Sequence, residues 1–246
     1  SAGNHAPGCV PFQPDGGPCL HGATMPYVVS TNILNAHARA VRVYRSRFEK
    51  AQGGRIGITL NCEMAIPLTA AADDVQAAER ALEFWLGWWL FPIMYGEYPP
   101  TMRENAADRL PTFSDDEQQL LVGSVDVLGI NTYSTHLVRA AKGAEVLNAT
   151  RGVAVDGWSA DQRVVSSFGT DWPSAASPWQ KSYPAGIREL LKWVAGKYGG
   201  DILVTENGWS CNTFTVSAAV HDAQQLEYFA AYTEQVRLPP AQGGGP

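Results

Sequence analysis

The sequence predicts an α/β protein in which helices alternate with three short buried strands. Three runs of mainly apolar and β-branched residues, 55–61, 125–130 and 202–205, have strand length and lead directly into polar residues. The segments between them carry apolar residues at helical spacing. Strands that alternate with helices in this way form a parallel sheet. The length of 246 residues would suit a complete (β/α)₈ barrel, but three strands indicate an open sheet or a piece of a barrel.

Composition indicates a soluble globular chain with a neutral ligand. Hydrophobic residues make up 45% of the sequence, which is enough for a sizeable core. The 18 Lys and Arg residues are outnumbered by 24 Asp and Glu, and no basic run occurs, so a nucleic-acid partner has no electrostatic support. The eight Trp, nine Tyr and eight Phe residues suit a sugar, whose ring faces are apolar, although most of them are expected in the core.

Two long helices are expected in the first half of the chain. The helix over 31–50 follows a glycine- and proline-rich loop over 1–26, and the second helix spans 73–90. Residues at helical spacing are expected to face inward on both: Ile33, Leu34, His37, Val41, Tyr44 and Phe48, then Val75, Ala78, Leu82, Trp85, Leu86 and Trp89. A histidine in such a stripe is more often a hydrogen-bonded core residue than a catalyst, which is the role predicted for His37.

The second half is expected to hold shorter elements and more loop. Residues 92–113 read as an irregular connection, and 114–117 form a capping box that starts a short helix ending near residue 123. Residues 135–178 lack periodicity and are expected to be loops with a hairpin. Helices follow over 186–198 and 218–236, separated by the third strand and a loop over 211–216. Leu226, Phe229 and Tyr232 are expected on one side of the last helix.

The ends of the chain and its cysteines give little functional information. Residues 1–236 are expected to be one partial barrel domain, and 237–246 a flexible tail rich in proline and glycine. Cys9 and Cys19 could close a small disulfide loop, and Asn148 begins a glycosylation sequon that matters only in a secretory route. The first thirty residues contain no signal-peptide pattern, so localisation stays open.

Neither a metal site nor a membrane span is predicted. The sequence contains no CxxC motif and no Cys/His ligand set, and no cofactor motif such as Gly-x-Gly-x-x-Gly. The most apolar stretch, 81–95, is interrupted by Glu83 and Pro92 and is too short to cross a bilayer.

Polar side chains follow each predicted strand and are the candidates for chemistry. Glu206 ends the third strand, Asn131 and Tyr133 follow the second, and Glu63 follows the first. The carboxyl ends of parallel strands are where α/β enzymes place their catalytic groups, because the strand aims the side chain while the loop shapes a pocket. The alternative for Glu206 is an ordinary strand-end carboxylate, and for Tyr133 a core aromatic.

Seven short segments, taken in order along the chain, carry a family resemblance. They are residues 5–8 (HAPG), 27–38 (YVVSTN followed by AHA), 57–63 (GITLNCE), 96–99 (GEYP), 109–113 (RLPTF), 129–133 (GINTY) and 205–208 (TENG). Together they resemble glycoside hydrolase family 1, the β-glucosidase family. The resemblance implies a (β/α)₈ barrel that cleaves β-linked O-glycosides with retention of configuration. It identifies this chain as an incomplete barrel covering roughly strands five to seven.

The resemblance also implies roles for three residues. Glu206 matches the nucleophile of the Thr-Glu-Asn-Gly motif. Tyr133 matches the tyrosine that hydrogen-bonds the nucleophile, and Asn131 the asparagine of the sugar pocket. The chemistry needs such a donor, since a hydrogen bond to a carboxylate stabilises its charged form and fixes its orientation.

One departure from the family limits the expected activity. The family's acid/base glutamate belongs to an Asn-Glu-Pro motif, which this sequence lacks, and Gln225 stands where arginine is usual. Retaining cleavage needs a second carboxyl about 5 to 5.5 Å from the first. Glu63 is the obvious substitute but lies in a segment that resembles a non-catalytic stretch. We therefore expect the isolated chain to be inactive, and a non-catalytic carbohydrate-binding or structural role is the alternative.

Overall fold

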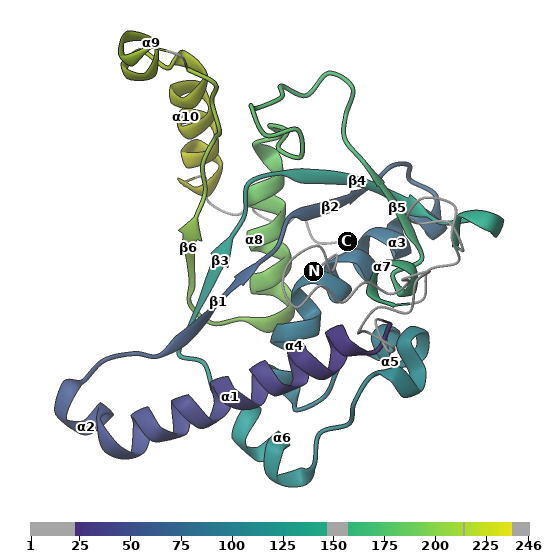
Figure 1. Cartoon of the computed structure of the whole chain (residues 1–246), viewed down its shortest axis with the longest axis vertical. Coiled ribbons are helices and arrows are strands. Elements are labelled where there is room, and N and C mark those ends of the chain that lie inside the picture. The colour runs from purple at the N-terminus through teal and green to yellow at the C-terminus, as the bar shows by residue number, and fades with distance from the viewer. Residues whose placement is uncertain (1–22, 147–156, 214, 238–246) are drawn as a thin grey trace, which may run out of the picture.

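The computed structural model describes residues 23–146, 157–213 and 215–237. The strands of these residues form two three-stranded sheets, one in the order β1-β3-β6 and the other in the order β2-β4-β5. They are β1 (Gly57–Asn61), β2 (Met64–Pro67), β3 (Val127–Asn131), β4 (Thr135–Ala140), β5 (Val164–Ser167) and β6 (Ile202–Glu206). The three predicted strands are thus confirmed as β1, β3 and β6, which lie side by side in Figure 1.

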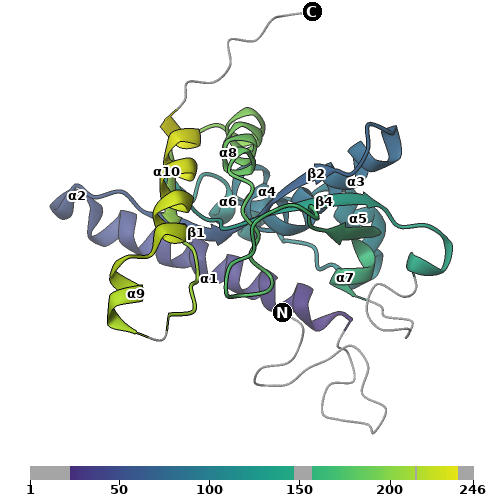
Figure 2. The same cartoon turned by 90° about the horizontal axis from the view of Figure 1, so that it is seen from above.

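Helices pack around these sheets. They are α1 (Met25–Arg47), α2 (Glu49–Gln52), α3 (Ala72–Leu82), α4 (Trp88–Tyr95), α5 (Pro100–Ala106), α6 (Asp115–Leu121), α7 (Trp158–Asp161), α8 (Ala185–Tyr198), α9 (Val216–Val220) and α10 (Ala223–Arg237). A π-helical turn over Glu83–Gly87 joins α3 to α4. Figure 2 shows α8 and α10, which contact each other, on the same side of the molecule.

The first sheet is parallel throughout. Asn61 of β1 lies opposite Asn131 of β3, and Asn131 lies opposite Glu206 of β6. The register between β3 and β6 shifts after Ile130, so Thr205 is an extra residue on β6. Such a bulge re-aims the side chain that follows it. All three strands end at the same edge of the sheet, where the predicted functional residues lie.

The second sheet continues two of these strands beyond a short break. β2 begins three residues after the end of β1, β4 begins four residues after the end of β3, and β2 and β4 pair in parallel. β5 pairs with β4 in antiparallel fashion, which confirms the hairpin predicted within 135–178. β2 was not predicted, because four residues that end in a proline carry too little pattern to identify a strand.

One face of the first sheet is buried and the other is open. Leu60, Leu128 and Ile130 pack with residues of α3, the π-turn, α4 and α8 in one apolar cluster. On the opposite face Leu203 of β6 is 56% exposed, and Thr59 and Thr205 are exposed as well. A second cluster joins α1 to α4, α5 and α6, and a third joins α10 to α8 and the loop after β6.

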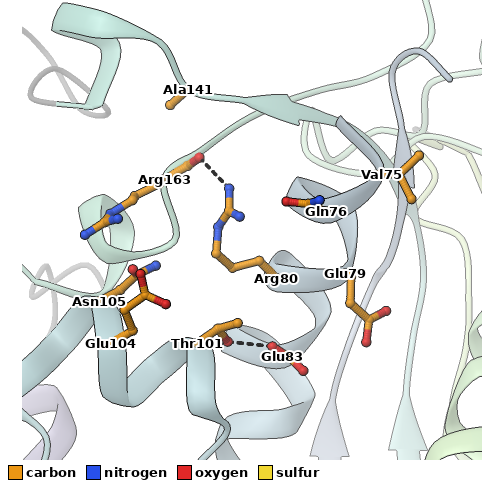
Figure 3. A pocket seen from close by; sticks show the side chains of 10 residues that line it. All are labelled: Val75, Gln76, Glu79, Arg80, Glu83, Thr101, Glu104, Asn105, Ala141 and Arg163. Carbon is orange, nitrogen blue, oxygen red and sulfur yellow. Dashed lines mark hydrogen bonds between the residues drawn. The ribbon is translucent and has the colours of Figure 1, made fainter. Parts of the chain in front are cut away.

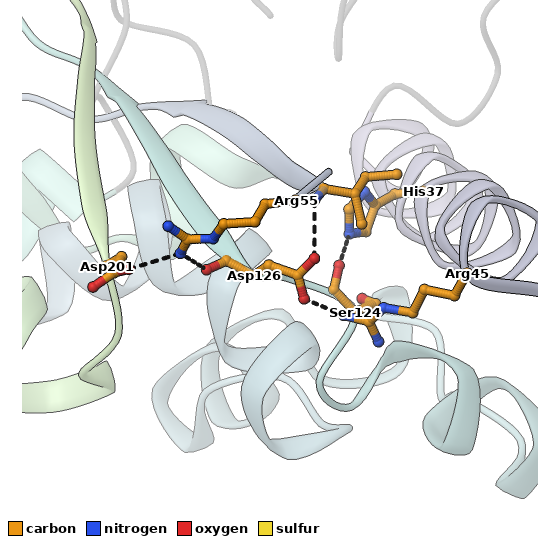
Figure 4. A network of polar contacts seen from close by, with 7 residues as sticks. His37, Arg45, Arg55, Ser124, Asp126 and Asp201 are labelled. Atoms are coloured by element: carbon orange, nitrogen blue, oxygen red, sulfur yellow. Dashed lines mark hydrogen bonds and ion pairs between the residues drawn. The ribbon is translucent and has the colours of Figure 1, made fainter. Parts of the chain in front are cut away.

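Charged groups tie the amino ends of the three strands together (Figure 4). The carboxylate of Asp126, just before β3, accepts hydrogen bonds from the amide of Ile56 at 2.9 Å and from Arg45 of α1 at 2.6 Å. Arg55 bridges the carbonyl of Asp126 to the carboxylate of Asp201, which precedes β6. The amide of Ile56 and the guanidinium of Arg45 lower the pKa of Asp126, so this carboxylate is charged at neutral pH.

His37 has the structural role that the sequence predicts. Its Nε2 atom lies 2.8 Å from the carbonyl oxygen of Ser124, in the connection that leads into β3. Burial lowers the pKa of the imidazole, which is therefore neutral at physiological pH.

The first helix begins six residues earlier than predicted, at Met25. Pro26 lies in its first turn, where a proline is tolerated because the first amides have no helical partner. Residues 25 and 26, predicted to be loop, are therefore helical, and residues 1–22 of that prediction lie outside the described residues. Tyr27 and Leu34 are fully buried, whereas Ile33 and Phe48 are 48% and 47% exposed, so those two inward assignments were wrong. The buried face of α1 is the one that packs against α4 and α6, and periodicity alone did not identify it.

The second helical region extends through Pro92 to Tyr95, so the irregular connection predicted from residue 92 was wrong there. A proline inside a helix costs roughly 3 kcal/mol. Burial of Leu90 and Ile93, each about 1.5 to 3 kcal/mol, offsets that cost. Pro99-Pro100 then starts α5, also unpredicted. Of the inward assignments on α3 and α4, Val75 is 48% exposed and was wrong.

The capping box and the penultimate helix are confirmed, but the last helix is divided. Ser114 and Glu117 exchange both hydrogen bonds of the box. The helix predicted over 218–236 is instead two helices, α9 and α10, separated at His221-Asp222. Leu226 and Phe229 are 71% and 41% exposed, whereas Tyr228 and Tyr232 are buried. Tyr232 therefore lies on the buried side of α10 without Leu226 and Phe229, because Tyr228 and Tyr232 find hydrogen-bond partners in another loop.

Several sequence predictions fall outside the described residues. Cys9, Cys19 and Asn148 lie there, as does the predicted tail except for Arg237, which ends α10. Cys62 and Cys211 are both free thiols. Across the described ranges, no helix combines the length and apolarity that a membrane crossing would need.

Gly57 provides a test of the β1–β3 pairing. A methyl group at this position would lie 1.8 Å from the carbonyl oxygen of Val127, so the two strands must move apart. We expect Gly57→Ala to lower the free energy of unfolding by about 1 to 3 kcal/mol, measured by urea denaturation. Gly196→Ala is the matched control, because a methyl group in this part of α8 meets nothing within 4 Å. It should raise stability by about 0.5 to 1 kcal/mol, and equal losses in both variants would contradict the predicted strand contact.

Candidate active site

The structure brings Glu206, Tyr133 and Asn131 together at one edge of the parallel sheet. Glu206 is the last residue of β6, Asn131 is the last of β3, and the two lie opposite each other in the ladder. Tyr133 follows two residues later in the break between β3 and β4. The three residues predicted from the strand ends therefore form one cluster.

Asn131 is oriented by the residue that the bulge inserts into β6. The hydroxyl of Thr205 donates to the Oδ1 atom of Asn131 at 2.7 Å. This hydrogen bond holds the side-chain amide of Asn131 in place. Thr205 thereby couples the end of β3 to the end of β6.

The hydroxyl of Tyr133 donates a short hydrogen bond to the Oε2 atom of Glu206. The Glu206 carboxylate raises the pKa of Tyr133 to about 12, chiefly through this hydrogen bond. Tyr133 is therefore a neutral donor at physiological pH. Glu206 itself is exposed on the open face of the sheet, where a ligand can reach it.

Three surrounding elements hold the turn that carries Tyr133. Glu63, between β1 and β2, accepts at a single oxygen, Oε2, from the amides of Tyr133 (2.9 Å) and Ser134 and from the hydroxyl of Thr132 (3.2 Å). The amide of Thr132 donates to the carbonyl of Glu206 at 3.0 Å. The side-chain amide of Asn207 donates from Nδ2 to the carbonyl of Thr132 at 2.8 Å.

Two tyrosines of α10 complete the set. The hydroxyls of Tyr228 and Tyr232 donate to the carbonyl oxygen of Tyr133 at 2.9 and 3.4 Å. Their rings stack with centroids 4.0 Å apart, and burial raises the pKa of both phenols. The backbone amide and carbonyl of Tyr133 are thus both occupied by side chains, which leaves its position little freedom.

Glu63 is placed as a structural acceptor and not as a free acid. Burial raises the pKa of its carboxyl group, while the amides of Ser134 and Tyr133 and the hydroxyl of Thr132 counteract part of that rise. All the hydrogen bonds that it receives from the turn converge on Oε2, so this oxygen faces the turn. Glu63, the substitute acid considered from the sequence, instead accepts hydrogen bonds from the backbone amides of this turn.

Trp179 is a candidate binding residue that the sequence did not single out. Its ring is 54% exposed and meets the ring of Tyr133 edge-on, with centroids 5.9 Å apart. The neighbouring Gln180 is buried and anchors this loop to the loop after β6, accepting from Ser210 and donating to the carbonyl of Gly208. An exposed indole beside Tyr133, whose hydroxyl binds Glu206, gives a sugar ring a surface on which to stack.

A cavity of about 730 Å³ lies elsewhere, between α3, α5 and the start of β5 (Figure 3). Two of its three carboxylates, Glu79 and Glu83, are paired with Lys197 of α8 at 2.5 and 2.7 Å. Arg80 donates to the carbonyls of Gln162 and Arg163. Its lining residues do not include any of the strand-end cluster, and we interpret the cavity as a groove between packed elements.

No group of three or more His, Cys, Asp or Glu side chains is placed to hold a metal ion within the ranges that the structure describes. The cluster around Glu206 offers instead one exposed carboxylate, a phenol donor and an amide. This combination can attack an electrophilic carbon and bind hydroxyl groups.

Comparison with protein families gives one match to nearly the whole chain. The model of Glycosyl hydrolase family 1 matches residues 1–240. Among curated relatives, β-glucosidase 25 of Oryza sativa subsp. japonica is 41% identical over 224 residues, covering 87% of this chain and 44% of the relative. The furostanol glycoside 26-O-β-glucosidase of Hellenia speciosa is 36% identical, covering 95% of this chain and 41% of the relative.

Solved structures of β-glucosidases share the fold. A mutant of a rice β-glucosidase, solved in a covalent complex with glucose, matches with a TM-score of 0.86 and 32% identity, covering 96% of this chain and 50% of that one. A β-glucosidase of the fungus Humicola insolens in complex with glucose matches with a TM-score of 0.84 and 32% identity over 96% and 49%. The chain spans about half the length of these relatives. The predicted fold class, an incomplete (β/α)₈ barrel, is confirmed.

The contact between Tyr133 and Glu206 can be measured through the phenol. Replacing Glu206 with glutamine removes the negative charge that opposes ionisation of Tyr133, so the pKa of Tyr133 should fall from about 12 toward its ordinary value of 10. Nuclear magnetic resonance of chain labelled at the tyrosine Cζ atoms would follow it, with Tyr133→Phe identifying the signal. Asp201→Asn, at the other end of β6, should leave the signal unchanged. A Tyr133 pKa that stays near 12 in Glu206→Gln would contradict the contact.

Proposed function

Because this chain belongs to glycosyl hydrolase family 1, we propose that the protein hydrolyses β-linked O-glycosides by a retaining mechanism with Glu206 as the nucleophile. The observation that carries this proposal is the hydrogen bond from Tyr133 to Glu206 at the edge where β3 and β6 end. The β-glucosidases that match the chain support a β-glucoside as substrate.

In the first step, Glu206 attacks the anomeric carbon of the sugar. Tyr133 occupies Oε2, so Oε1 is the oxygen that we propose forms the glycosyl ester. The bond from the anomeric carbon to the leaving oxygen breaks, and the leaving oxygen takes a proton from an acid. The rice relative solved in a covalent complex with glucose supports an intermediate of this kind.

In the second step, water attacks the same carbon and releases Glu206. A base must take the proton of that water, and in retaining enzymes this is the group that first acted as acid. We propose that Asn131, whose Oδ1 atom accepts from Thr205, donates its side-chain amide to a sugar hydroxyl. Trp179 supplies an exposed apolar face beside Tyr133 for the sugar or its aglycone.

We infer that the described residues do not supply the proton donor. A retaining enzyme places its two carboxyl groups about 5 to 5.5 Å apart. Glu63 lies near the site, but Oε2 is bound to the turn after β3. The sequence also contains no Asn-Glu-Pro triplet. We propose that the 246-residue chain has a nucleophile without an acid partner and does not turn over ordinary glycosides.

Covalent trapping tests the nucleophile separately from the acid. A 2-deoxy-2-fluoro-β-glucoside with a dinitrophenolate leaving group needs no protonation, and its fluorine slows hydrolysis of the ester. The chain should gain the mass of one fluoroglucosyl group on the peptide that contains Glu206, as read by mass spectrometry. Glu206→Gln should abolish the label and Asp201→Asn should retain it. A label on another residue, or one that persists in Glu206→Gln, would refute the proposed nucleophile.

Turnover of unactivated substrates tests the missing acid. The purified chain should release no more product from an alkyl or aryl β-glucoside than its Glu206→Gln variant does, whereas enzymes typically reach roughly 1 to 1000 turnovers per second. Turnover in that range, lost in Glu206→Gln, would show that the chain contains its own acid. Saturable glucoside binding by calorimetry, without labelling or hydrolysis, would favour the carbohydrate-binding alternative.

A further inference from the structure

Side chains from three other segments hydrogen-bond the backbone of the turn between β3 and β4. Residues 132–134 interrupt the parallel pairing, because β3 ends at Asn131 and β4 begins at Thr135. The partner strand is interrupted at the same level by Cys62 and Glu63, between β1 and β2. Amides in such a gap have no ladder partner and need another acceptor.

Glu63 supplies that acceptor. Its Oε2 atom receives the amides of Tyr133 and Ser134 and the hydroxyl of Thr132. These are consecutive residues, so one carboxylate oxygen fixes the path of the whole turn. A charged acceptor makes stronger hydrogen bonds than a neutral one.

The position of the turn decides where the phenol of Tyr133 lies. Its backbone carbonyl is held from the other side by Tyr228 and Tyr232 of α10. With amide and carbonyl both fixed, the side chain projects toward β6, where its hydroxyl meets Glu206. Glu63 therefore acts on Glu206 indirectly, through the turn and through Tyr133.

We propose that Glu63 is a positioning residue, whose carboxylate holds the Thr132–Ser134 turn so that the Tyr133 hydroxyl stays on Glu206. This inference rests on the proposed function for the importance of that contact, but the contact itself is measurable without catalysis. Glu63 is thereby assigned a role other than proton donor, although it is a carboxylate close to the proposed nucleophile.

Two conservative substitutions separate the position of Glu63 from its charge. Glu63→Asp keeps the charge but shortens the side chain by one methylene group, so it withdraws the carboxylate from the two amides. Glu63→Gln removes the charge but keeps an oxygen within reach of them. Glu63 raises the pKa of Tyr133 directly only through its charge. A purely electrostatic role therefore predicts the larger fall of the Tyr133 pKa in Glu63→Gln, whereas a positioning role predicts the larger fall in Glu63→Asp.

The full chain, labelled at the tyrosine Cζ atoms, would be titrated in each variant. Positioning predicts that Glu63→Asp lowers the pKa of Tyr133 by about one unit and that Glu63→Gln lowers it by clearly less. A larger fall in Glu63→Gln, or no fall in Glu63→Asp, would overturn the proposal. Asp126→Asn removes the charge of a comparable backbone acceptor at the amino end of β3 and should leave the Tyr133 pKa unchanged.

Amide hydrogen exchange at neutral pH gives a second measurement that avoids strong alkali. The amides of Tyr133 and Ser134 should exchange at least tenfold faster in Glu63→Asp than in Glu63→Gln, while the amides of β1 and β3 stay protected in both. Equal exchange of the two turn amides in both variants would contradict positioning. Global loss of protection in Glu63→Asp would also contradict it, because it would make Glu63 a general stability residue.

The outcome is independent of covalent trapping at Glu206. Trapping that succeeds while the Tyr133 pKa follows the electrostatic order would leave the proposed function standing and remove the role of Glu63. A larger fall of the Tyr133 pKa in Glu63→Asp, without any trapping at Glu206, would support the role of Glu63 and refute the proposed function.

Discussion

The parallel pairing of β3 with both β1 and β6 is the constraint on which the rest of this structure depends. It aligns the ends of three strands, so that residues far apart in the sequence meet at one edge. Glu206 and Tyr133 are 73 residues apart and form a hydrogen bond there. The bulge at Thr205 adds the final adjustment, since it places Glu206 opposite Asn131 and allows Thr205 to hold the asparagine amide.

The amino and carboxyl ends of these three strands have different roles. At the amino ends, Arg45, Arg55, Asp126 and Asp201 pair with one another, and each charge there is matched by an opposite one (Figure 4). At the carboxyl ends, Glu206 is exposed and its hydrogen bond comes from a neutral phenol. Paired charges stabilise a fold, whereas an unpaired carboxylate on an open face is available for a substrate. This division between a stability edge and a chemical edge is the one expected of barrel enzymes.

Much of the fold and of the candidate site could be predicted because their signals are local. The three parallel strands, the capping box at Ser114 and the helix α8 all follow from short patterns. The errors have tertiary causes. Pro92 lies inside a helix because Leu90 and Ile93 are buried. The face of α10 is set by Tyr228 and Tyr232, whose hydroxyls bond the Tyr133 carbonyl across the molecule. Trp179 was missed because it lies in a loop without periodicity.

The sequence by itself determined the identity of the strand-end residues and the family, because polar groups placed directly after apolar runs are read without knowing the fold. Only the tertiary structure decided what each of them touches. Glu63 and Glu206 are both strand-end glutamates in the sequence, yet one is fastened to backbone amides and the other receives a phenol on an open face. The physical reason is that a carboxylate's role follows from its neighbours and its access to solvent, and strand pairing across long stretches of chain sets both.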